Sequence, residues 1–150
     1  MLTCLTRAEA WEMKEPFEIS REVISSVRVL HVELRDEQGR RGVAEAAGVD
    51  YDGETPEGLA REIEAVAGDL HDDLGGSDLL RLLPAGGARN ALDCALWDLR
   101  AKQSGRPAWQ LAGLRGMRPV LTDCTIGLGD DRATRRKARE AREFRLLKLK

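Results

Sequence analysis

The strongest helical pattern in the chain is Ala88-Arg89-Asn90-Ala91-Leu92-Asp93-Cys94-Ala95-Leu96-Trp97-Asp98-Leu99. Its apolar residues recur at steps of three and four, so they form one face of a helix predicted from Ala88 to Ser104. Gly105 suits the left-handed position after the last turn, and Pro107 prevents any continuation. The apolar face of such a helix must be buried against a second layer of secondary structure.

The sequence before this helix predicts that layer, an antiparallel hairpin. Val23–Arg35 alternates like a half-buried strand, with Leu30, Val32 and Leu34 on one face, and Arg41–Ala47 returns after a polar turn. The other elements expected up to residue 115 are a first strand within residues 1–12, a polar, lid-like loop over 12–22, an acidic loop over 48–54, a helix opening at Thr55, and short helices after Gly75 and from Trp109. This is an α+β arrangement.

The pattern changes after residue 116. Val120–Leu128 reads as a strand, Asp130–Phe144 as a basic helix with a solvated outer face, and Leu146–Lys150 as a second strand. Strand, helix and strand in this order form a βαβ unit with parallel strands. We therefore expect two domains, residues 1–115 and residues 116–150.

Composition narrows the class of partner. A formal net charge of −2 gives no electrostatic footprint for nucleic acid or an anionic membrane, so we expect a small molecule and copies of the chain itself, as a homo-oligomer. No apolar run approaches the ~20 residues of a membrane span, and the first residues lack the order of a signal peptide. Three cysteines without a C-x-x-C pair predict neither a disulfide framework nor a zinc site, and Cys94 and Cys124 are expected to be buried thiols. The protein is expected to be cytoplasmic.

Two motifs suggest ligands only at first sight. Asp93 and Asp98 on the strongest helix are five residues apart and project about 140° from each other, so structural pairing is favoured over a shared metal ion. Gly127 and Gly129 stand between a strand and a helix, but the third glycine and the lysine of phosphate loops are missing. A nucleotide site is therefore not predicted.

The final residues, Leu146-Leu147-Lys148-Leu149-Lys150, place two lysines on an apolar strand. Because side chains alternate along a strand, Lys148 and Lys150 share a face, roughly 6.6 Å apart. Two ammonium groups this close disfavour each other's charged form, so one amine is prepared to accept a proton. The pair is thus a candidate base, and the alternative is an edge strand whose lysines hinder aggregation.

Three stretches together resemble the enolase superfamily, in particular its muconate lactonising subgroup and the dipeptide epimerase family: Leu83–Leu99, Thr122–Gly127 and Leu147–Lys150. The resemblance covers nearly the whole chain. It implies an α+β N-terminal capping domain followed by the start of a (β/α) TIM-type barrel. The barrel is incomplete in this chain, because a full one needs roughly 200 to 250 residues.

The resemblance implies abstraction of a proton α to a carboxylate, giving an enediolate held on magnesium. Lys150 is implied as the acid/base, with Lys148 beside it. The magnesium ligands, the opposing lysine and the aspartate pair that grips a dipeptide's amino group are expected beyond residue 150. These 150 residues alone are therefore expected to be inactive.

The resemblance also implies substrate contacts. Arg21 is expected to meet the acidic side chain of an Ala-Glu dipeptide, and Thr125 to line the substrate cavity. Asp50 and Tyr51, with Asp52, lie in the second loop, whose acidity would also suit a cationic dipeptide. Muconate cycloisomerase and o-succinylbenzoate synthase stay open as alternatives, as does a non-catalytic capping module that acts in assembly or interaction.

Overall fold

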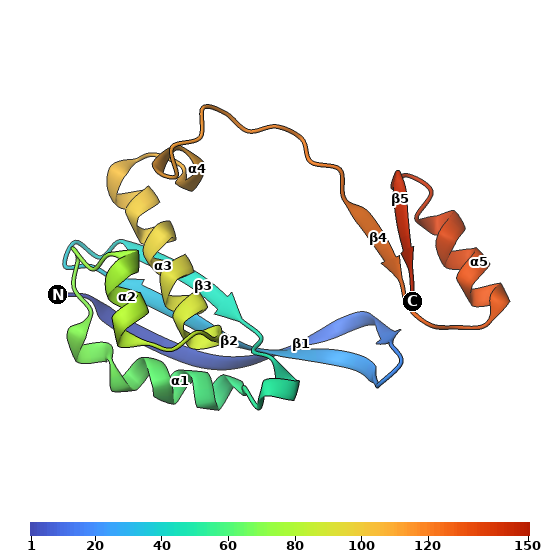
Figure 1. Cartoon of the computed structure of the whole chain (residues 1–150), viewed down its shortest axis with the longest axis horizontal. Helices are drawn as coiled ribbons and strands as arrows, with labels where there is room; N and C mark the ends of the chain where they lie inside the picture. Colours follow the sequence, from blue (N-terminus) through green and yellow to red (C-terminus); the bar gives the residue numbers. More distant parts are fainter. The chain divides into compact units, whose positions relative to one another are not determined.

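The computed structural model describes all 150 residues, which divide into two compact units. One comprises Met1–Ala10 and Arg28–Gly116, the other Trp11–Val27 and Met117–Lys150. The two longest strands, β1 (Thr3–Glu18) and β2 (Val23–Arg35), contribute to both (Figure 1). The predicted division between residues 115 and 116 stays a prediction, because a compact unit need not be a domain that folds alone.

The first unit is built on a sheet with the order β1-β2-β3. β3 (Arg41–Ala46) runs antiparallel to β2, with Leu30 opposite Ala46 and Arg35 opposite Arg41. The predicted alternation of β2 is present, and the face that carries Leu30, Val32 and Leu34 is the core face, since these three residues are fully buried. The hairpin was predictable because its alternation is local to the two strands.

The turn between β2 and β3 is organised by the buried side chain of Asp36. Its Oδ1 accepts hydrogen bonds from the backbone N–H groups of Gln38 (3.0 Å) and Arg40 (2.9 Å). Its Oδ2 accepts from Arg40 Nε (2.6 Å) and from Gln103 Nε2 (3.0 Å). One carboxylate thus closes the turn and ties it to the last turn of a helix.

The helices of the first unit are η1 (Asp50–Asp52), α1 (Pro56–Ala65), η2 (Ala67–Asp69), α2 (Gly76–Leu82), α3 (Gly87–Ser104) and α4 (Ala108–Leu111). The predicted start of α1 is confirmed, because the hydroxyl of Thr55 accepts the N–H of Gly58 at 3.1 Å. α3 ends as expected at Gly105, whose φ is 65°. The buried residues that α1 and α3 add to the core include Leu59, Ile63, Leu92, Leu96 and Leu99.

α3 packs closely on β3, and Gly42 makes this contact possible. A Cβ at Gly42 would collide with the backbone oxygen of Ala95 and lie 2.6 Å from Cβ of Leu99. Both neighbours belong to the body of the helix and cannot turn aside. Gly42 is therefore the point at which the two layers approach each other.

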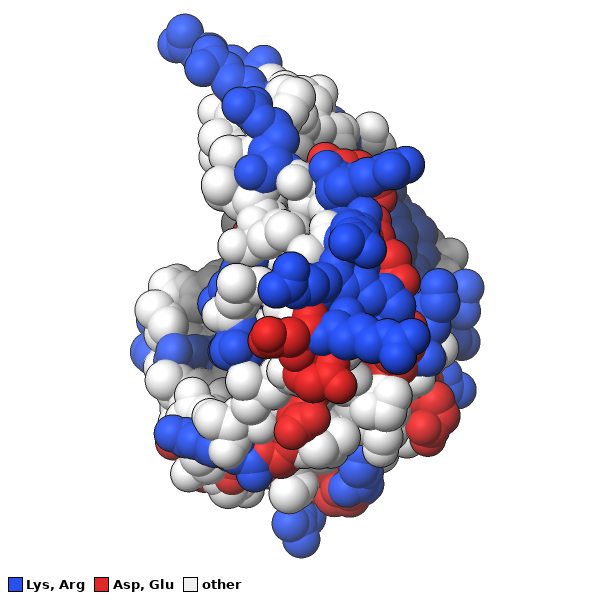
Figure 2. Space-filling view, turned by 90° about the vertical axis from the view of Figure 1, so that its right-hand side faces the viewer, with Lys and Arg blue, Asp and Glu red and all other residues white.

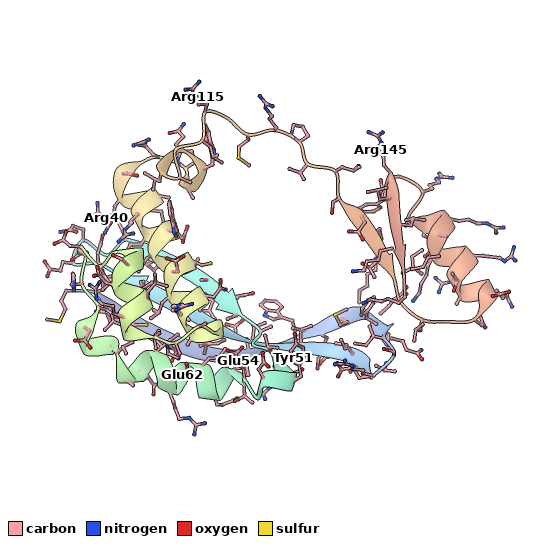
Figure 3. All side chains as sticks on the ribbon, in the orientation of Figure 1. Arg40, Tyr51, Glu54, Glu62, Arg115 and Arg145 are labelled. Carbon is pink, nitrogen blue, oxygen red and sulfur yellow. The ribbon has the colours of Figure 1, made fainter.

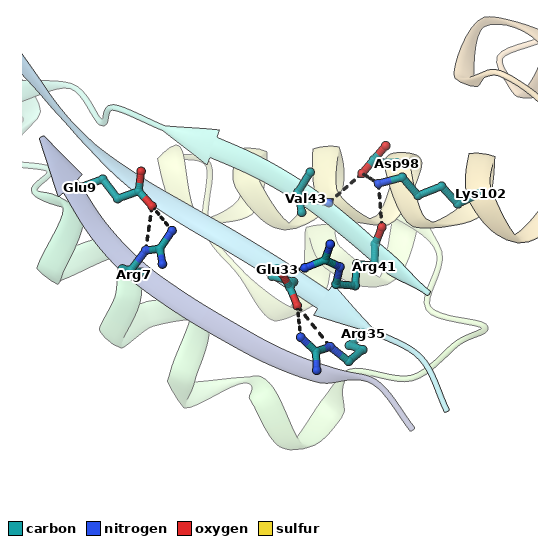
Figure 4. A network of polar contacts seen from close by, with 8 residues as sticks. All are labelled: Arg7, Glu9, Glu33, Arg35, Arg41, Val43, Asp98 and Lys102. Atoms are coloured by element: carbon teal, nitrogen blue, oxygen red, sulfur yellow. Dashed lines mark hydrogen bonds and ion pairs between the residues drawn. The ribbon is translucent and has the colours of Figure 1, made fainter. Parts of the chain in front are cut away.

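Side chains of α3 also bind the outer edge of β3 (Figure 4). Asp98 Oδ2 accepts the backbone N–H of Val43 at 2.8 Å. Lys102 Nζ donates to the backbone oxygen of Arg41 at 2.7 Å and to Asp98 at 2.6 Å. For Asp98 the predicted structural pairing is confirmed.

The second unit contains β4 (Asp123–Ile126), α5 (Asp131–Glu140) and β5 (Leu146–Leu149). β4 and β5 are parallel neighbours, so the predicted strand, helix and strand are confirmed. The basic residues of α5 are mostly exposed, with Arg136 and Glu140 paired at 3.1 Å. Figure 2 shows Lys and Arg side chains, with carboxylates between them, spread over the face that carries α5.

Two sequence expectations were wrong. Residues 12–18, expected to form a loop, belong to β1, and only the segment from Ile19 to Glu22 turns, closed by a backbone hydrogen bond of 2.9 Å. Pairing with β2 outweighs the weak local strand preference, and Pro16 is tolerated because β1 is an edge strand. Cys94, expected to be buried, is exposed on α3.

The three cysteines are all free thiols. Burial, together with the nearby charge of Glu64, raises the pKa of Cys4 to about 11, so this thiol stays protonated near neutral pH. None of the helices has the length and apolar character that crossing a membrane requires.

Candidate functional site

The two candidate catalytic lysines lie at the carboxyl end of β5. Lys148 is directly opposite Thr125 of β4, so these two side chains project from the same face of the strand pair. Lys150 follows β5, and its backbone N–H donates to the oxygen of Ile126 at 3.1 Å. Both lysines are exposed. The structure thus brings together Thr125 and Lys148 and fixes the backbone of Lys150 one step further on.

The end of β1 meets the same edge. The backbone N–H of Leu128 donates to the oxygen of Glu18 at 2.9 Å. A Cβ at Gly127 would lie 2.8 Å from that oxygen and 3.2 Å from Cδ2 of Phe17. Gly127 therefore permits a close approach of two strands, which explains the glycine without a phosphate ligand.

The start of α5 is capped by the side chain of the residue just before it, Asp130. Asp130 Oδ1 accepts the N–H of Ala133 at 2.7 Å. A carboxylate at this position repels an anion, so the start of α5 is not suited to bind a phosphate group.

A cavity of about 330 Å³ lies where β1, β4 and α5 meet, within the second unit. Its lining includes Phe17, Thr125, Lys137 and Glu140 and neither Lys148 nor Lys150. The size falls in the range of small-molecule sites. Thr125 is therefore the candidate residue that connects this cavity to the face of the lysines.

The remaining candidate substrate residues are divided between the units. Arg21 is exposed in the turn between β1 and β2, in the same unit as the lysines. Asp50 and Tyr51 belong to η1 in the other unit, where Tyr51 is 82% exposed. Arg21, Thr125 and the two lysines thus belong to one compact unit, and Asp50 and Tyr51 do not.

Sequence reasoning missed Glu54, which accepts hydrogen bonds from the backbone N–H groups of Val49 and Gly87, both at 2.8 Å. It lines a cavity of about 810 Å³ together with Asp52 and Glu62. The sequence offers only an indirect sign of this contact. A strong helix preceded by glycines has no neighbouring side chain that can cap its first N–H groups. Such a helix needs a partner from elsewhere in the chain.

The residues described here do not fit the magnesium ion that the resemblance implies. No group of three or more His, Cys, Asp or Glu side chains in the 150 residues is arranged to hold a metal ion. No chemical step is therefore assigned to a metal bound by these residues.

Comparison with known proteins identifies the family to which this chain belongs. The sequence matches the family described as Mandelate racemase / muconate lactonizing enzyme, N-terminal domain, over residues 1–113. It is 38% identical to L-Ala-D/L-Glu epimerase of Escherichia coli (strain K12) over 129 residues, which is 86% of this chain and 40% of that protein.

Two solved structures share the fold. An enolase family member from Agrobacterium tumefaciens with homology to dipeptide epimerases, with bound sodium and L-Ala-L-Glu, has a TM-score of 0.90 at 34% identity, covering 100% of this chain and 46% of that one. The dipeptide epimerase from Methylococcus capsulatus, complexed with Mg and the dipeptide L-Arg-D-Lys, has a TM-score of 0.81 at 31% identity. The match covers 99% of this chain and 45% of that one.

This chain spans less than half the length of these relatives. The predicted fold class, an α+β N-terminal capping domain followed by the start of a TIM-type barrel, is confirmed. The chain belongs to the mandelate racemase / muconate lactonizing enzyme family of the enolase superfamily.

Proposed function

We propose that this chain forms part of a dipeptide epimerase that acts on dipeptides of the Ala-Glu type. The observation that carries the proposal is the lysine pair at the carboxyl end of β5, adjacent to Thr125 on the parallel strand β4. Catalytic groups of barrel enzymes stand at the carboxyl ends of strands. The identity to L-Ala-D/L-Glu epimerase supports the choice of substrate.

In this proposal Lys150 exchanges the proton on the α-carbon of the C-terminal residue. Its amine removes the proton from one face, and its ammonium form returns a proton to that face in the reverse direction. Lys148, on the same side of the strand, contributes a positive charge toward the substrate carboxylate. Inversion requires a second base on the opposite face, which we assign to the part of the protein outside these 150 residues, together with the magnesium site.

Arg21 is proposed to select the acidic side chain of the substrate. A guanidinium group in the β1–β2 turn can bind a carboxylate through two parallel N–H···O hydrogen bonds. The competing proposal is a cationic dipeptide, which the acidic residues Asp50 and Asp52 and the likeness to the Methylococcus capsulatus enzyme favour.

Proton exchange in deuterated water tests the reaction. The full-length protein with magnesium should exchange the α-proton of the glutamate residue in L-Ala-L-Glu and L-Ala-D-Glu, as followed by proton NMR. Lys150→Ala should lower by at least about 100-fold the exchange of the epimer whose α-proton faces Lys150, and with it the conversion of one epimer into the other, because it removes the acid/base on that face. Lys14→Ala removes an exposed lysine from β1 and should leave the rate unchanged. Exchange of both epimers and their interconversion at wild-type rates by the Lys150 variant would contradict the assignment.

A dipeptide library decides the substrate class. Arg21→Gln should raise KM for Ala-Glu by about tenfold while a neutral dipeptide is unaffected. If Lys-Arg dipeptides are the better substrates and the Arg21 variant behaves as wild type, the cationic alternative replaces the Ala-Glu proposal.

The proposal includes a cytoplasmic homo-oligomer. Three free thiols suit a reducing compartment. The oligomeric state stays a prediction, and light scattering of the full-length protein measures it directly.

A further inference from the structure

Glu54 joins two segments that are far apart in the sequence. One carboxylate oxygen accepts the N–H of Val49, just before η1, and the other accepts the N–H of Gly87, the first residue of α3, each at 2.8 Å. The first N–H groups of a helix have no partner inside the helix, and Gly86 at the cap position has no side chain to offer. Glu54, which follows Tyr51 by three residues, therefore caps α3 from outside the helix (both residues are labelled in Figure 3).

Gly86 and Gly87 leave room for this carboxylate. A Cβ at Gly86 would lie 2.6 Å from Glu54 Oε1. A Cβ at Gly87 would lie 2.8 Å from Cδ1 of Leu59 and 3.2 Å from Glu54 Oε2. The two glycines thus form a slot at the start of α3, and the carboxylate of Glu54 fills it.

The same contact closes the segment before it. The backbone oxygen of Val49 accepts the N–H groups of Asp52 (2.9 Å) and Glu54 (3.3 Å), while its N–H is held by the Glu54 side chain. Gly53, with φ at 76°, allows the chain to turn back. Both the N–H and the oxygen of Val49 are therefore hydrogen-bonded, which fixes the residue before η1. Tyr51 within η1 is exposed to solvent.

We propose that Glu54 is a positioning residue, which fixes Asp50–Asp52 against α3 so that Asp50 and Tyr51 meet the ligand in one conformation. The role toward substrate rests on the dipeptide epimerase function proposed above. A segment fixed in advance does not have to be ordered when the ligand binds, which removes an entropic cost from binding.

Fluorine NMR of Tyr51 tests whether Glu54 fixes the segment. The full-length protein is labelled with 3-fluorotyrosine, and the Tyr51 resonance is identified by its loss in Tyr51→Phe. Glu54→Gln keeps the size of the side chain but loses one acceptor, because an amide nitrogen donates only. Glu62→Gln is the matched control, since it makes the same change in an exposed residue of the same cavity.

The Tyr51 resonance should shift or broaden in Glu54→Gln and match wild type in Glu62→Gln. Because the amide oxygen can still accept one of the two hydrogen bonds, amide hydrogen exchange at either Val49 or Gly87 should be about tenfold faster in the Glu54 variant alone. An unchanged resonance and unchanged exchange in Glu54→Gln, or equal changes in both variants, would overturn the proposal.

Kinetics test the role toward substrate. Glu54→Gln should raise KM for the dipeptide by about tenfold while kcat stays close to wild type. A fall in kcat at unchanged KM would overturn the positioning role. If the wild-type protein turns over no dipeptide, the proposed function fails, while the resonance and the exchange rates still decide whether Glu54 fixes the segment.

Discussion

Asp36 illustrates how a single buried carboxylate links the geometry of a turn to the pH range of the fold. Burial by itself would raise its pKa. Three hydrogen bonds, one from Gln103 and two from the side chain and backbone of Arg40, act in the opposite direction, as does the positive charge of Arg40. Together they outweigh burial and lower the pKa of Asp36 to about 2. The group is therefore ionised in the fold at pH values where an unfolded chain begins to protonate it.

A pH dependence of stability follows from Asp36. A folded pKa below the unfolded value of about 3.9 stabilises the fold above pH ~4, and this contribution is lost as the pH falls toward 2. In Asp36→Asn, unfolding between pH 4 and 2 should take up about one proton fewer than in wild type. Urea unfolding of the full-length protein at several pH values measures this slope. The exposed Asp73→Asn is the control, and equal slopes for Asp36→Asn and wild type would contradict the assignment.

At the scale of elements, the contact between α3 and β3 depends on a missing side chain. Gly42→Ala places a Cβ against the backbone of α3, which must shift as a whole to accept it. We expect the free energy of unfolding to fall by roughly 3 kcal/mol. Urea unfolding with an unchanged m-value measures the loss.

The control for this substitution is Gly68→Ala, where a Cβ meets nothing within 4 Å. Its effect should stay within about 0.5 kcal/mol. Because Gly→Ala by itself reduces the entropy of the unfolded chain and favours the fold, comparable losses at both positions would show that the approach of α3 to β3 does not account for the requirement at Gly42.

At the scale of the whole molecule, the connection between α4 and β4 is the expected site of cleavage. Residues 115–122 are exposed and lie outside helices and strands, and Figure 3 labels Arg115 in this connection. Trypsin should cut first after Arg115, because the other arginine here, Arg118, precedes a proline. Mass spectrometry should identify a fragment of residues 1–115, and Arg115→Gln should delay it. Earlier cleavage within α1–α3 would contradict the predicted division of the chain at residue 115.

The parts of the structure that the sequence predicts are those decided by neighbours in the chain. The stripe of α3 and the alternation of β2 are local patterns, and both place the core correctly. The extension of β1 through Pro16 depends on pairing with β2, which no local pattern encodes. The roles of Thr125 and Lys148 were anticipated only through the family resemblance, and the register that sets them opposite each other was not predicted. Glu54 escaped notice because its partner Gly87 lies 33 residues away.

The capping of β3 by Asp98 and Lys102 bears on how this protein avoids joining copies of itself by accident. β3 is the last strand of its sheet, and an open last strand is a template on which another chain can add a strand. The side chains of α3 use the N–H of Val43 and the carbonyl of Arg41 that such a strand would need. During synthesis, however, β3 emerges 55 residues before Asp98, so this protection arrives only once α3 has been made.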